Sequence, residues 1–273
     1  MSAFLLYEFP LGFAFISMFI ILLVANEIGY RAGLARFRQS RDGDQDVELA
    51  RNDITLTALL ALLGLMLAFT YAVELNRHDL RKQETVNEAN AIDTAFLRAD
   101  FADEPVRTRL REALLEYAKT RTASVERSTS KEDLDLLRAH SLTVQETLWP
   151  LTKELVVESE LPGPIKASII AAVNDVLDAE TARSATIYDR MPPIIFVLLV
   201  LISGLSIGMA SYNNGLEGHI HRWRISMFAF VLTSLMTVIV DFEKPLTGFI
   251  HVSQTPITAT IENLEAELQR EKD

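Results

Sequence analysis

The chain of 273 residues has no cysteine and only 11 glycines. The absence of cysteine excludes disulfide bonds, thiolate catalysis and zinc sites with cysteine ligands. A phosphate-cradling glycine loop, a Ser/His/Asp signature and an HExxH motif are absent as well. His219 and His221 alternate beside Arg222, which is ordinary for a short interfacial loop. We therefore expect neither an enzyme nor a bound metal or cofactor.

The chain also has no excess of positive charge: its formal net charge is −11 at pH 7. Nucleic-acid binding relies on a basic face that neutralises phosphates. The composition therefore predicts no nucleic-acid partner.

What the chain does contain is apolar sequence, 49% of all residues, gathered into four blocks at about 11–30, 54–75, 193–212 and 225–242. Each block is close to the roughly 20 residues that a helix needs to cross a bilayer. The sequence therefore predicts an all-α integral membrane protein with four transmembrane helices in the lipid bilayer. The helices form two pairs, within residues 1–75 and 191–242.

Charged, helix-favouring sequence fills residues 76–190, between the second and third spans. No glycine or proline occurs between Gly64 and Pro105, so the second span is expected to continue into this region as one rod. We expect a helical extramembrane bundle there. Residues 243–273 are expected to form an amphipathic C-terminal helix with an apolar seam that docks on this bundle or on copies of itself. The seam consists of Ile257, Ile261, Leu264 and Leu268.

The arginines suggest an orientation in the inner membrane. Arg31, Arg36, Arg38, Arg41 and Arg51 all lie in or beside the loop between the first two spans. Arginine-rich short loops stay in the cytoplasm. This predicts that the N-terminus and the region 76–190 lie on the outer side.

Two faces of the second span suggest different roles. Small residues, among them Ala61, Gly64 and Ala68, recur at spacings of three and four, which lets helices approach closely. Gly204 and Gly208 form a similar GxxxG pattern in the third span. The adjacent face of the second span is bulky and would line a pore in a symmetric assembly, with Phe69 and Val73 as an apolar constriction. Its residues are Leu62, Leu65, Phe69 and Val73.

A polar cluster on the continuation of the second span comprises Asn87, Glu88, Asn90 and Asp93. The cluster is interpreted either as a solvated face or interhelical hydrogen-bond network, or as a site for ions.

Several stretches resemble the bacterial bestrophin-like domain family, four-span membrane proteins mostly of unknown function. The resemblance lies in the run from Leu67 to Asp79, in the run from Val86 to Arg98, and in the run from Asp241 to Ile250. Asn174, Asp178 and Arg183 ahead of Pro192-Pro193 add to it. Bestrophins form pentameric chloride channels whose second helix lines the pore and continues into an aqueous neck. The resemblance therefore implies a homo-oligomer, a pentamer if the likeness extends that far, that conducts inorganic ions.

Two functions remain open from the sequence. One is an oligomeric ion channel with the second span lining the pore. The other is a non-conducting membrane sensor or scaffold whose extramembrane bundle binds a partner.

Overall fold

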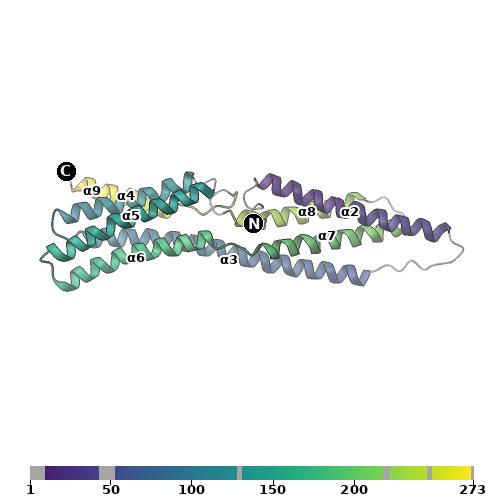
Figure 1. The fold of residues 1–273 in the computed structure, drawn as a ribbon, viewed down its shortest axis with the longest axis horizontal. Helices are drawn as coiled ribbons and strands as arrows, with labels where there is room; N and C mark the ends of the chain where they lie inside the picture. Colours follow the sequence, from purple (N-terminus) through teal and green to yellow (C-terminus); the bar gives the residue numbers. More distant parts are fainter. Residues whose placement is uncertain (1–9, 43–52, 128–130, 218–221, 245–247, 272–273) are drawn as a thin grey trace. The chain divides into compact units, whose positions relative to one another are not determined.

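The computed structural model describes residues 10–42, 53–127, 131–217, 222–244 and 248–271. All regular elements in these ranges are α-helices (Figure 1), which confirms the predicted all-α fold. They are α2 (Leu11–Asp42), α3 (Asp53–Ala99), α4 (Val106–Arg127), α5 (Lys131–Glu158), α6 (Gly163–Tyr188), α7 (Pro193–Leu216), α8 (Arg222–Phe242) and α9 (Thr255–Arg270).

Four helical stretches of the described residues are long and apolar enough to cross a membrane, one at each apolar block. This confirms the predicted multi-pass membrane protein. Helix α3 is the longest element, with 47 residues. It runs without a break from the second apolar block into the charged sequence, as the lack of glycine and proline predicts.

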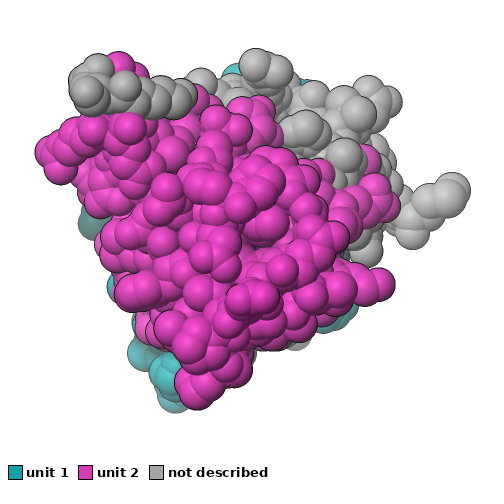
Figure 2. Space-filling model, turned by 90° about the vertical axis from the view of Figure 1, so that its left-hand side faces the viewer, with its two compact units in different colours: residues 1–75, 190–244 teal, residues 76–189, 245–273 magenta. Residues whose placement is uncertain are grey.

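The chain divides into two compact units, which Figure 2 distinguishes by colour. Residues 1–75 with 190–244 are named the membrane unit, and residues 76–189 with 245–273 are named the outer unit because they lie outside the apolar blocks of the sequence. The first boundary falls at the end of the second apolar block, so α3 contributes to both units.

Helices α2 and α7 of the membrane unit are in backbone contact through glycines. A Cβ atom added to Gly29 would lie 2.1 Å from the carbonyl oxygen of Gly208, and one added to Gly33 would lie 2.2 Å from that of Tyr212. Gly29 and Gly33 are themselves a GxxxG pair, and such pairs let two membrane helices pack closely. The sequence analysis identified Gly208 but missed Gly29 and Gly33 on α2. Gly204 lies further from α2, with 4.0 Å between its added Cβ and the Cβ of Ala25.

Hydrogen bonds between side chains also join the membrane helices. The Ser211 hydroxyl of α7 donates to Asn26 Oδ1 of α2 at 2.5 Å, and Asn26 Nδ2 donates to Ser226 Oγ of α8 at 3.3 Å. In an apolar surrounding, polar side chains are stable where they bond to one another across helices.

The core of the outer unit is built from α3, α4, α5, α6 and α9. Its fully buried residues include Ile92, Phe96, Leu114, Leu155 and Val173. Pro150 lies within α5, which continues past it to Glu158.

Helix α9 packs against the other helices of the outer unit within its own chain. Ile257 and Leu264 are buried, and Ile261 and Leu268 pack against the same core at its edge. The apolar seam is therefore used within the chain.

Candidate functional site

Helix α3 presents one buried face from Leu63 to Ala99. Apart from Ala89 and Ala95, the buried positions recur at intervals of three, four or seven residues, so they lie on one side of the helix. We call this side the inner face; its residues are Leu63, Thr70, Glu74, Arg81, Thr85, Glu88, Ile92, Phe96 and Ala99.

The opposite side of α3, the outer face, is exposed except at half-buried Thr94. From Phe69 onward its positions follow an unbroken alternation of four-residue and three-residue steps. Its residues are Leu62, Leu65, Phe69, Val73, Asn76, Leu80, Gln83, Asn87, Asn90, Thr94 and Leu97.

The four residues predicted to line a pore all belong to the outer face. Leu62, Leu65, Phe69 and Val73 are exposed by 46%, 54%, 65% and 51%. Within one chain these side chains are therefore left for lipid, water or another molecule to cover.

The small residues of α3 are exposed as well. Ala61, Gly64 and Ala68 lie at the surface, and a Cβ added to Gly64 would meet no described atom within 4 Å. Their predicted role in helix packing thus has no counterpart in the described part of the chain, and it stays a prediction for contacts between chains.

The predicted polar cluster is distributed over different sides of α3. Glu88 is buried on the inner face, whereas Asn87 and Asn90 lie on the outer face and Asp93 is half-buried between them. Asn87 donates to the neighbouring Glu84 at 3.2 Å. The four side chains therefore do not converge on one ion.

Glu88 forms the centre of a buried ion-pair network instead. Arg121 Nε of α4 lies 2.7 Å from its Oε1, and Arg183 of α6 donates to its Oε2. Tyr117 of α4 donates its hydroxyl to Oε1 at 2.5 Å. Arg121 Nη1 also lies 3.6 Å from Glu180 Oε1. Two carboxylates thus match two guanidiniums, which is the condition under which buried charges are tolerated.

The network keeps Glu88 and Arg121 charged, and it keeps the Tyr117 hydroxyl protonated. Burial by itself raises the pKa of Glu88, but Arg121 and Arg183 lower it, and the net pKa lies below its usual value. Burial and the neighbouring Glu88 carboxylate raise the pKa of Tyr117 well above its usual value. The Tyr117 hydroxyl therefore keeps its proton and stays a donor. Burial lowers the pKa of Arg121, but Glu88, Tyr117 and Glu180 together raise it, and the net pKa lies above its usual value.

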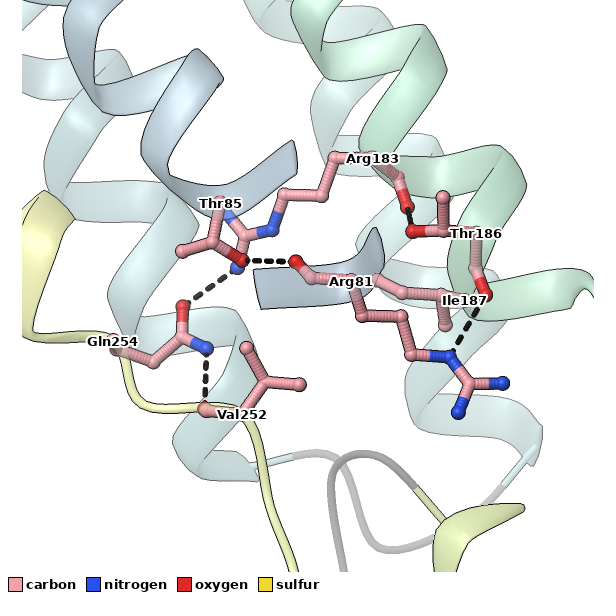
Figure 3. A pocket seen from close by; sticks show the side chains of 7 residues that line it. All are labelled: Arg81, Thr85, Arg183, Thr186, Ile187, Val252 and Gln254. Carbon is pink, nitrogen blue, oxygen red and sulfur yellow. Dashed lines mark hydrogen bonds between the residues drawn. The ribbon is translucent and has the colours of Figure 1, made fainter. Parts of the chain in front are cut away.

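A small cavity lies beside this network, lined by α3, α6 and the segment before α9 (Figure 3). Arg183 donates to Gln254 Oε1 at 2.6 Å, and Arg81 Nε donates to the Thr186 carbonyl at 3.0 Å. Arg81 also donates to the Asp189 carbonyl at 3.0 Å. The cavity measures about 10 Å³, the size of one water molecule. It has no room for an organic ligand, and its arginines serve to join α3, α6 and the chain before α9.

Sequence reasoning missed most of this network. The signal available in the sequence was the spacing, which places Arg81 and Glu88 on the same side of the helix as the core residues Ile92 and Phe96. Among the described residues, no three His, Asp or Glu side chains gather in a way that could hold a metal ion. His219 and His221 lie outside the described residues.

Comparison with known protein families gives a match to most of the chain. The profile of the bestrophin-like domain matches residues 31–257. No curated protein and no solved structure matches the chain.

Proposed function

Because the chain belongs to the bestrophin-like domain family, we propose that it is a subunit of an oligomeric ion channel in which the outer face of α3 borders the conducting pathway. The observation that carries this proposal is the exposure of one continuous face of α3 beyond the bilayer. Lipid can cover Leu62 to Val73, but it cannot cover Leu80 and Leu97, which are exposed by 43% and 48%. This exposed face continues from the bilayer into the aqueous phase, and other copies of the chain around a common axis would explain its exposure in both.

Homo-oligomers usually have closed symmetry, and a cyclic ring places the same face of each subunit at the axis. In such a ring, Phe69 and Val73 become an apolar constriction. Narrow apolar constrictions control ion flow by excluding water. The conducted species are small inorganic ions, and the family resemblance implies five subunits.

We also propose that the arginine-rich segment 31–53 faces the cytoplasm and that the outer unit faces the other side of the inner membrane. Because the chain has no cysteine, a single introduced cysteine is its only thiol, and labelling of that thiol shows which side of the membrane it faces. A membrane-impermeant maleimide should label Ser128→Cys in intact cells, and Ser40→Cys only after permeabilisation. The reverse pattern contradicts this orientation.

The channel proposal is tested by recording from purified protein in planar bilayers. Phe69→Ala widens the constriction and should raise the conductance of single channels. The matched control is Phe13→Ala, which removes a 53% exposed phenylalanine from α2 and should leave the conductance unchanged. A folded, oligomeric protein that is silent over a range of voltages contradicts the proposal and favours the non-conducting sensor or scaffold.

A further inference from the structure

The outer face carries no charged residue in the extramembrane part of α3. Eight of the 24 residues from 76 to 99 are Asp, Glu, Lys or Arg, and none of them falls on the seven outer-face positions there. Those positions are filled by Asn76, Leu80, Gln83, Asn87, Asn90, Thr94 and Leu97.

This distribution is unusual for a helix face in water. Charged residues normally cover the solvated side of a helix, and here Asp79 and Lys82 are exposed beside the outer face rather than on it. A dry helix contact would also carry no charge, but it would be apolar at most positions. Five of the seven positions are instead amides or a hydroxyl, groups that remain stable in contact with water.

Amide side chains have a further property that bears on ions. Each Asn or Gln offers a carbonyl acceptor and an NH₂ donor, so it solvates a cation or an anion. Rings of charged side chains select ions by sign, as do clefts lined by charge of one sign. A ring of amides has no such preference.

We propose that the stretch Asn76–Leu97 of the outer face borders a water-filled, amide-lined vestibule that admits hydrated inorganic ions of both signs. This inference rests on the proposed channel function and adds the class of permeant species to it. It also assigns Glu88 no part in selectivity, because that carboxylate lies on the inner face and is paired with Arg121 and Arg183.

The test uses the absence of cysteine in the chain. Asn87→Cys and Asn90→Cys place single thiols on the outer face, and Lys82→Cys places one on the exposed flank of α3. Each variant is recorded in a KCl gradient before and after reaction with a negatively charged or a positively charged methanethiosulfonate. The unmodified channel should reverse between the potassium and chloride equilibrium potentials.

The negative adduct at Asn87→Cys or Asn90→Cys should shift the reversal potential toward that of potassium, and the positive adduct toward that of chloride. The adducts at Lys82→Cys should cause no comparable shift. Complete modification at Asn90→Cys, shown by mass, without any shift overturns the proposal. So does a thiol at position 90 that reacts only after denaturation, because that indicates a dry contact.

A second readout separates this proposal from the channel function. Spin labels at Asn90→Cys in the assembled protein should give shorter distances between copies than labels at Lys82→Cys. If the protein is silent but this order holds, the channel function fails while the water-filled arrangement stands. The opposite order overturns the vestibule whether or not the protein conducts.

Discussion

The two faces of α3 reverse the usual relation between charge and exposure. The inner face is buried and yet carries Glu74, Arg81 and Glu88, each seven residues after the last. The outer face is exposed and yet carries no charged residue from Leu62 to Leu97. A helix that merely separated a core from solvent would show the opposite pattern.

The difference between the faces assigns stability to the inner face and the proposed function to the outer face. In the outer unit, Arg81 and Glu88 of the inner face bond to α4, to α6 and to the residue that follows α6, and so hold the helices together. Among the described residues, the outer face contributes no comparable bonds. Its uncharged pattern is therefore explained by its position in the proposed assembly.

The largest expected effect comes from breaking the inner face. Glu88→Gln removes the charge that compensates Arg121 and Arg183, and unpairing a buried ion pair costs about 3–5 kcal/mol. The midpoint of thermal unfolding of the full chain in detergent should fall markedly. Asp79→Asn, which neutralises an exposed carboxylate nine residues earlier on the same helix, is the control and should leave the midpoint unchanged. Equal stability of Glu88→Gln and the wild type would contradict the role of the inner face.

Acidification should weaken the same network by a smaller amount. The pKa of Glu88 is lower in the folded chain than its usual value. Its stabilising contribution is therefore fully present above the unfolded-state pKa and is lost as the pH falls through the folded-state pKa. Wild-type protein should lose stability below about pH 4, where ordinary carboxyl groups take up protons. Glu88→Gln should show a shallower loss over that range, and identical pH profiles would contradict this assignment.

A comparison of glycines sharpens the contrast between packed and unpacked helix surfaces. Gly29→Ala drives a Cβ against the carbonyl oxygen of Gly208 and should cost roughly 1–3 kcal/mol through overpacking. Gly64→Ala meets no atom within 4 Å and should be neutral or stabilising by up to about 1 kcal/mol, because alanine favours a helix. Thermal unfolding of both variants provides the measurement. If Gly64→Ala is as damaging as Gly29→Ala, α3 makes a close contact between copies at Gly64.

The sequence predicted the elements of this fold well and the network poorly, for physical reasons. Runs of about 20 apolar residues need no partner to be recognised, and the lack of glycine and proline after Gly64 predicted the long α3. The burial of Glu88 depends on residues far along the chain: Arg183, which pairs with it, follows 95 residues later. Asn87, Glu88 and Asn90 therefore look like one polar group until the partners of Glu88 are known.

The glycine contact shows the same limit in the membrane unit. The GxxxG pattern of α7 was recognisable by itself, but its partner helix was not. Gly29 and Gly33 lie in α2 where the apolar block gives way to arginines, so the pair did not stand out as part of a span.

The central claim is that the outer face of α3 turns toward other copies of the chain, and cross-linking in native membranes tests it most directly. Phe69→Cys supplies a single thiol on the outer face, and Ile16→Cys supplies one on α2, where Ile16 is 57% exposed. A short thiol cross-linker should convert Phe69→Cys, but not Ile16→Cys, into a ladder of covalent oligomers. A ladder from Ile16→Cys, with Phe69→Cys remaining monomeric although a lipid-soluble maleimide labels it, would contradict the account.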